Sequence, residues 1–219
     1  LITSETNARG KTVDRLNAPY RRFAGFGTPP AKNGDFAFLL HMLASLKSNG
    51  RGAIILPHGV LFRGNAEGTI RRNLIERGYI RGIIGLPANL FYGTGIPACI
   101  ILLDKASAGG RRGIFFLDAS QGYLKDGNKN RLRERDIHRI VDVFTARRAV
   151  PGYARMVPYS EISENDYNLN IPRYIQRPDD RDHHDIGAHL YGGHPATDLA
   201  AQSENSDINP QKRRAQIRA

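Results

Sequence analysis

The chain has 219 residues, 40% of them hydrophobic, which is enough for one domain with a proper core and an appendage. Its 32 Lys and Arg outnumber its 21 Asp and Glu, so the formal net charge of +11 indicates an anionic partner, with nucleic acid first. No hydrophobic run approaches membrane-spanning length, and a single cysteine excludes a disulfide framework, so we expect no membrane partner and a reducing, cytoplasmic location.

Residues 1–32 are polar and basic and end in glycines and prolines, which predicts a loop region. Its cations either face phosphates or belong to a solvated arm; they are Arg9, Lys11, Arg15, Arg21 and Arg22. The chain begins with Leu1 and has methionine only at positions 42 and 156, from which we expect a natural start further upstream.

Residues 33–150 alternate between helical and strand patterns. Apolar side chains at helical spacing predict an amphipathic helix over residues 35–47, with Asp35 as a candidate cap. A buried strand over residues 52–56 follows, and then a second helix over residues 67–77. That second helix is expected to expose Arg71, Arg72 and Arg77. The alternation indicates an α/β sheet whose first two strands are parallel.

Pro57, His58 and Gly59 follow the first of these strands, at the edge of the sheet where ligands usually bind. A lone histidine in this position is more typical of a capping or hydrogen-bonded structural group than of a catalytic one.

Residues 79–86 and 96–103 are apolar runs that predict two buried strands. The link between them is too short for a crossover helix, so the last strand is expected to run antiparallel. Residues 87–95 join the strands and carry Phe91 and Tyr92 between glycines. This loop either faces a ligand or is a hairpin whose aromatic rings plug the core, whereas Cys99 is expected to be a small core residue.

The remaining residues add one strand, one helix and a polar end. Residues 113–119 predict a strand, and residues 132–148 predict a basic amphipathic helix with Ile137, Ile140, Val141 and Phe144 on its apolar stripe. Residues 151–176 are expected to be irregular and to pack on the domain. Residues 177–219 are expected to form a polar tail or the start of a helical subunit-contact region. Within them, residues 182–185 are typical of a solvated run rather than a metal site.

Catalytic motifs are missing from these residues. No nucleophilic triad, zinc-ligand spacing or phosphate-binding glycine loop occurs, so we expect no catalytic residue and no metal site in this chain. The residues alone indicate an α/β fragment with an edge that faces a ligand and a basic surface.

Five stretches carry a resemblance to a known family. They are GDFAFLLHML (34–43), GRGAIILPHGVLFRGNAEGTIRRNLIE (50–76), GLPANLFYGTGIPACIILLDK (85–105), NDYNLNIPRYI (165–175) and DIGAHLYGG (185–193). Together they resemble the modification subunit of type I restriction-modification systems, an adenine-N6 DNA methyltransferase that uses S-adenosylmethionine. The resemblance covers most of residues 26–193 and follows the order of the family.

The resemblance implies a Rossmann-like methyltransferase sheet that ends in an antiparallel strand, of which this chain is the carboxyl-terminal half with a C-terminal extension. The family's glycine-rich cofactor loop and its Asn-Pro-Pro-aromatic catalytic motif do not occur here; residues 28–30, Thr-Pro-Pro, lack the Asn and the aromatic. The implied partners are double-stranded DNA, a specificity subunit, a restriction subunit and a second modification subunit.

Four positions match the family's site segments. Asp35 and Phe38 match a motif that borders the cofactor, although Phe38 could also be an ordinary helix-packing residue. Phe91 matches an aromatic residue that stacks on the adenine flipped out of the duplex, with Tyr92 as its neighbouring alternative. The implied function is part of a site-specific adenine methyltransferase. The alternatives are a non-catalytic DNA-contacting or scaffold half-domain and, more remotely, a methyltransferase that acts on RNA or protein.

Overall fold

The computed structural model describes residues 2–6, 12–16 and 21–176. The first two of these segments form an antiparallel hairpin of β1 (Ile2–Thr6) and β2 (Thr12–Leu16), with Ile2 opposite Leu16. The loop predicted for residues 1–32 is therefore wrong for this part, because β-branched residues favour strands even in a polar segment. The predictions for Arg9 and Lys11 and for residues 177–219, including the run at 182–185, lie outside the described residues.

Helices and strands alternate along residues 35–173. Their bounds are α1 (Asp35–Ser45), β3 (Arg51–Pro57), η1 (His58–Leu61), α2 (Asn65–Glu76), β4 (Ile80–Gly85), β5 (Ala98–Asp104), η2 (Ala108–Gly110), β6 (Gly113–Asp118), β7 (Leu124–Asp126), β8 (Lys129–Arg131), α3 (Glu134–Ala146), β9 (Ala154–Pro158), α4 (Tyr159–Glu164) and η3 (Ile171–Arg173). The predicted helices and apolar strands are therefore present, with ends that shift by a few residues.

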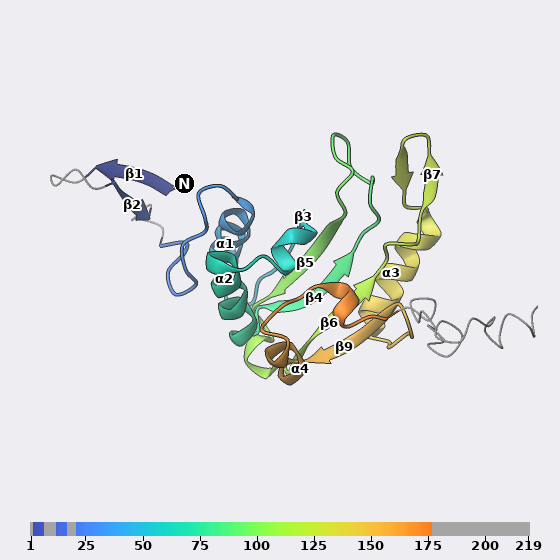
Figure 1. The fold of residues 1–219 in the computed structure, drawn as a ribbon. Coiled ribbons are helices and arrows are strands. Elements are labelled where there is room, and N and C mark those ends of the chain that lie inside the picture. The colour runs from blue at the N-terminus through green and yellow to red at the C-terminus, as the bar shows by residue number, and fades with distance from the viewer. Residues whose placement is uncertain (1, 7–11, 17–20, 177–219) are drawn as a thin grey trace, which may run out of the picture. The chain divides into compact units, whose positions relative to one another are not determined.

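A five-stranded mixed sheet in the order β3-β5-β4-β6-β9 organises these elements (Figure 1). Only β4 and β6 pair in parallel, and the other neighbouring strands are antiparallel. β5 runs antiparallel to β4, as the short link predicted. β3 and β4 point the same way, as expected, but they are not neighbours because β5 lies between them and pairs with both.

Each face of the sheet buries its own hydrophobic cluster. Side chains of a strand alternate between faces, so Ile114 and Phe116 belong to one cluster, and Phe115 and Leu117 to the other. α1 and α2 cover the first face, whereas α3 covers the second (Figure 1). On the second face the rings of Phe115 and Phe144 meet edge to face at 5.5 Å between centroids.

Residues 151–176 are more regular than predicted. β9 adds an antiparallel edge strand to β6, and α4 and η3 follow it. Arg155 on β9 holds the segment together, because it pairs with Glu161 of α4 and its Nε donates to the Tyr174 carbonyl at 2.6 Å. The ring of Tyr174 packs against Phe116 in the first cluster. The segment is therefore an integral part of the sheet and the core.

Three local predictions need correction. Asp35 does not cap α1, because Gly34 occupies the cap position and Asp35 begins the first turn. Ile137 and Val141 of α3 are 47% and 53% exposed, so the buried stripe of that helix is narrower than predicted. Arg71 is buried rather than exposed. No helix of the described residues has the length and apolar character needed to cross a membrane.

Candidate functional site

The carboxyl ends of β4 and β6 meet at one edge of the sheet, together with the end of β3; we name this the carboxyl edge. A cavity of about 340 Å³ lies there, and its lining comes from segments far apart in the sequence. The polar residues that line it are His58, Asp118, Ser120, Gln121, Tyr123, Asn130 and Asn170. Loops at this edge are where α/β proteins usually bind ligands, so the cavity marks the candidate site.

His58 opens η1, directly after β3, and is half-buried. Its Nε2 lies 2.8 Å from the Ala98 carbonyl oxygen. Burial lowers the pKa of the imidazole, against smaller opposite effects of this hydrogen bond and of the Asp118 charge. A neutral ring that donates from Nε2 to Ala98 satisfies both observations, which is the hydrogen-bonded structural role expected for this residue.

The loop of residues 87–97 connects β4 to β5 and is fastened to the β7–β8 hairpin. The Asn130 side-chain amide donates to the Ala88 carbonyl at 2.7 Å, and its backbone N–H donates to the Asn89 carbonyl at 2.9 Å. Lys129 Nζ donates to the Phe91 carbonyl at 2.8 Å. Hydrogen bonds from the β7–β8 hairpin therefore fix the backbone of the loop and with it the positions from which the loop side chains extend.

Phe91 and Tyr92 stand at the tip of this loop in different environments. Phe91 is partly buried and packs against the cluster under α3, as the core-plug alternative requires. The Tyr92 ring is 93% exposed, so it is available to a ligand. Neither residue lines the cavity of His58 and Asp118.

Asp35 and Phe38 lie in the first turns of α1. Arg63 joins this helix to α2, because its guanidinium contacts Asp35 Oδ2 and Glu67 Oε1, both at 2.9 Å. Phe38 is 70% exposed, whereas Phe36 fills the core, so the helix-packing alternative for Phe38 is wrong. Residues three apart on a helix lie on the same face, so Asp35 and Phe38 share one face of α1.

Arg71 supports this region from the interior, although the sequence predicted it to be exposed. It is 4% exposed, and its guanidinium donates to the carbonyls of Val60, Arg63 and Tyr167 at 3.2, 2.8 and 2.8 Å. Its position along the helix could have predicted this burial, because residue 71 lies on the same face of α2 as the buried residues 67, 74 and 75.

Cys99 of β5 is buried in the core. Burial raises the pKa of the Cys99 thiol to about 12, as expected for a core residue. Among the residues that the structure describes, no group of three or more His, Cys, Asp or Glu is arranged to hold a metal ion.

The sequence matches the N-6 DNA methylase family over residues 10–183, most of the chain. The chain belongs to the N-6 DNA methylase family. The resemblance to type I modification subunits is thereby confirmed, because the relatives of this methylase chain carry that description.

Two curated relatives and one solved structure illustrate the match. The chain is 34% identical over 166 residues to the type I restriction enzyme MpnII methylase subunit of Mycoplasma pneumoniae, which covers 75% of this chain and 30% of the relative. It is 35% identical over 175 residues to the MjaVII methylase subunit of Methanocaldococcus jannaschii, covering 78% and 30%. The type I methyltransferase subunit from Streptococcus thermophilus shares 47% identity and a TM-score of 0.68 over 73% of this chain and 34% of that one. The chain thus spans about a third of these relatives.

Proposed function

We propose that this chain is part of a site-specific DNA methyltransferase that transfers a methyl group from S-adenosylmethionine to adenine N6 within a type I restriction-modification complex. The family match over residues 10–183 carries the proposal. The carboxyl edge supports it, because a cavity with convergent polar groups lies there beside a fastened loop that bears aromatic rings.

The sheet is proposed to be part of a larger, Rossmann-like sheet. β5 lies between two strands that run opposite to it, which fits the antiparallel closing strand that the family resemblance implies. Among the described strands β3 pairs only with β5, and Ile55 in its middle is 52% exposed. A long edge strand of this kind favours pairing with a further strand, and in the proposal that strand belongs to the part of the enzyme with the catalytic motif.

Phe91 and Tyr92 are proposed to form one wall of the target-base pocket. A base that leaves the duplex loses its stacking energy, and an aromatic side chain restores part of it. Tyr92 is nearly fully exposed at the tip of a loop whose backbone is held by Lys129 and Asn130. Phe91 would then act either as a stacking ring after a local shift or as the support of the tip.

Asp35 and Phe38 are proposed to border the cofactor, and their chemistry fits it. S-adenosylmethionine carries an adenine ring together with sulfonium and ammonium cations, and when bound it supplies the methyl group. Phe38 offers an exposed aromatic face, and Asp35 a partly exposed carboxylate that Arg63 holds in place. Asp35 and Glu67 are balanced by Arg63 and Arg71, and the partly exposed Asp35 is the carboxylate proposed to attract a cationic ligand.

The partners proposed for the whole enzyme follow from the resemblance to type I modification subunits. They are double-stranded DNA, a specificity subunit that selects the sequence, a restriction subunit and a second modification subunit, in the cytoplasm where the DNA lies. The strongly basic composition of the chain is compatible with a nucleic-acid partner.

Substitutions in the loop test the base-pocket proposal in the enzyme that carries this chain, assembled with its specificity subunit. Phe91→Ala and Tyr92→Ala are expected to slow methyl transfer to duplex DNA, for the stacking residue by about five- to hundred-fold. Calorimetry should show that S-adenosylmethionine still binds. Ile96→Ala is the matched control, since Ile96 is an exposed apolar residue that follows the same loop tip.

Unchanged transfer in both aromatic variants contradicts the stacking role while leaving the family assignment intact. The scaffold alternative would be favoured instead if the assembled wild-type enzyme binds DNA but does not bind S-adenosylmethionine and does not transfer methyl groups.

A further inference from the structure

A second cavity, of about 720 Å³, lies at the opposite edge of the sheet from the candidate site. Its lining surrounds the start of β4 at Arg81, the turn before β6 and the end of β9 at Pro158. We name this the amino edge. β6 runs from one edge to the other over six residues, so the two edges lie roughly 17 Å apart at about 3.3 Å per residue.

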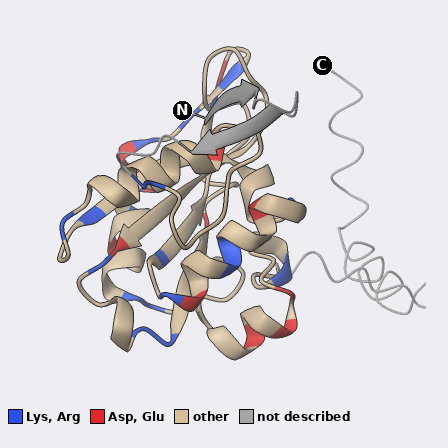
Figure 2. Cartoon of the chain, turned by 90° about the vertical axis from the view of Figure 1, so that its left-hand side faces the viewer, with Lys and Arg blue, Asp and Glu red and all other residues tan. Residues whose placement is uncertain are grey.

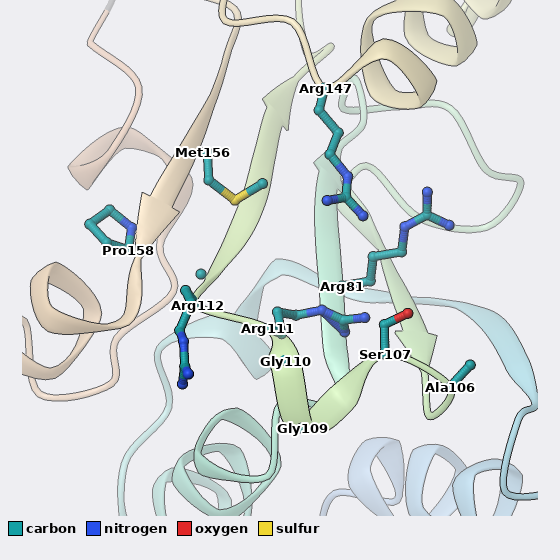
Figure 3. A pocket seen from close by; sticks show the side chains of 11 residues that line it. Arg81, Ala106, Ser107, Gly109, Gly110, Arg111, Arg112, Arg147, Met156 and Pro158 are labelled. Atoms are coloured by element: carbon teal, nitrogen blue, oxygen red, sulfur yellow. The ribbon is translucent and has the colours of Figure 1, made fainter.

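Arginines dominate the charge of this cavity. Figure 3 shows Arg81, Arg111 and Arg147 gathered on one side of it, whereas Arg112 points away from them. No Asp or Glu is among the residues that line it. By contrast, Lys, Arg, Asp and Glu are interspersed over the helices and loops of the side that Figure 2 presents. The cavity therefore concentrates charge of one sign in a hollow.

Arg111 forms the floor of the cluster, with a side chain that is 7% exposed. Its Nη1 donates to the Gly78 carbonyl at 2.8 Å, and its Nη2 lies 3.6 Å from Asp104 Oδ2 without a hydrogen-bond partner. Burial lowers the pKa of its guanidinium, and the charges of Arg147 and Arg81 lower it further, against the opposite effect of Asp104. Arg81 and Arg147 are therefore each close enough to Arg111 to destabilise its charge.

The carboxylates nearby do not neutralise this cluster. Asp104 supplies one negative charge and shares it between Arg111 and Arg51. In the part of the chain that the structure describes, no carboxylate forms an ion pair with Arg81 or Arg147. Arg81 lies over the ring of Phe144, and its Nε is buried without a hydrogen-bond partner.

Arg147 reaches the cluster from the end of α3 at some conformational cost. Its backbone is left-handed, with φ 48° and ψ 36°, a conformation that glycine adopts with less strain. The helix dipole favours a cation at this end of α3. It does not account for the approach of that cation to two further guanidinium groups.

We propose that the amino edge binds phosphate groups, in the clustered form found in a nucleoside di- or triphosphate or in successive phosphates of a nucleic-acid backbone. Guanidinium forks match phosphate oxygens in pairs, and three of them around one cavity suit an anion with several charges. The volume lies within the range of small-molecule sites. The ligand relieves the mutual repulsion of Arg81, Arg111 and Arg147. This inference does not depend on the proposed methyltransferase function.

Calorimetric titration of the full protein that carries this chain tests the site, with inorganic tripolyphosphate as the probe at constant ionic strength. We expect saturable binding that Arg147→Gln and Arg81→Gln each weaken by about ten-fold. Arg148→Gln is the matched control. It removes the same charge from the neighbouring residue, and Arg148 is exposed but does not line the cavity. We expect it to change the affinity by less than about two-fold.

Two further arms identify the source of the phosphate. Competition of ATP with tripolyphosphate, lost in Arg147→Gln, identifies a nucleotide. A larger loss of duplex-DNA affinity in Arg147→Gln than in Arg148→Gln, without ATP binding, identifies backbone phosphates. The proposal is overturned if tripolyphosphate does not bind saturably, or if Arg148→Gln weakens it as much as Arg147→Gln, because a diffuse basic surface would then explain the charge.

Discussion

The two edges of the sheet handle charge in opposite ways. At the carboxyl edge Arg63 is neutralised by Asp35 and Glu67, and His58 is a weakened base that bonds to a carbonyl. At the amino edge Arg81, Arg111 and Arg147 gather around a cavity that no carboxylate lines. One sheet thus carries a neutral, closely bonded edge suited to positioning polar groups and a like-charged edge suited to an anion.

The supports beneath the two edges differ as well. Side-chain hydrogen bonds between distant segments hold the carboxyl edge, above all those of Arg71 to Val60 and Tyr167. Close backbone contact holds the amino edge, where Gly78 lies against the carbonyl of Ala108. Substitutions at these supports therefore break one edge at a time.

Arg71→Met is expected to have the largest effect. It removes three hydrogen bonds to buried or partly buried carbonyls and takes from the buried Glu67 one of its two nearby cations, leaving it only Arg63. We expect the free energy of unfolding to fall by about 3–5 kcal/mol, as for the loss of one partner in a buried ionic network. Urea denaturation followed by circular dichroism measures it.

Arg72→Met is the matched control for this substitution. Arg72 is the next residue of α2, but it is exposed and pairs with Glu76 on the surface. Arg72→Met should lower the free energy of unfolding much less than Arg71→Met, because surface ion pairs contribute little to stability. Equal losses for the two variants would contradict the supporting role of Arg71.

The sequence predicted the strands and helices with strong periodicity but not the roles of its arginines. The apolar runs of β4 and β5 and their short link determined the antiparallel pairing, because no crossover fits there. By contrast, Arg71 and Arg72 are identical in type, and only the phase of the helix separates the buried one from the exposed one. The exposure prediction treated all arginines of α2 as surface residues and was therefore wrong for Arg71.

Elements whose stability comes from tertiary contacts were also missed. β9 is short and includes Arg155 and Met156, so it lacks a strand pattern and forms because β6 offers a free edge. The amino-edge cluster draws Arg81, Arg111 and Arg147 from three separate segments, which the pairing of β4 with β6 and the packing of α3 on the sheet bring together. At the candidate site, Asp118 and Asn130 carried no motif that pointed to them.

Gly78→Ala is expected to have an intermediate effect, at the amino edge. Gly78 has φ +68°, and a Cβ there would lie 2.3 Å from the Ala108 carbonyl oxygen. Strain and displacement of the turn together should lower the free energy of unfolding by about 2–3 kcal/mol. Because the turn of Ala108 precedes Arg111, tripolyphosphate affinity should fall too.

Gly109→Ala serves as the control for Gly78→Ala. A Cβ at Gly109 meets no atom within 4 Å, so stability should change little, although the residue lines the same cavity. A stable Gly78→Ala variant with normal phosphate binding would show that the backbone contact does not support the amino edge.

His58 gives the smallest effect, a pH dependence confined to the carboxyl edge. Burial lowers the pKa of His58 from its ordinary value of 6.5, so the unfolded chain binds this proton more readily than the folded one. Stability from the neutral ring is fully present above about pH 6.5 and is lost as the pH falls from there through the lowered pKa. The arginines of the amino edge keep their charge over the same range.

Urea denaturation of wild type and His58→Gln between about pH 7.5 and about pH 5.5 measures the difference, since histidine is the side chain that ordinarily titrates there. The loss of stability on acidification should be smaller in His58→Gln, while His138→Gln, which removes an exposed histidine of α3, should retain the wild-type slope. The Asp118 charge opposes the effect of burial on His58, so Asp118→Asn should steepen the acid loss. A slope that is unchanged in His58→Gln would mean that burial does not disfavour the protonated imidazole, and the two edges would then not differ in their response to pH.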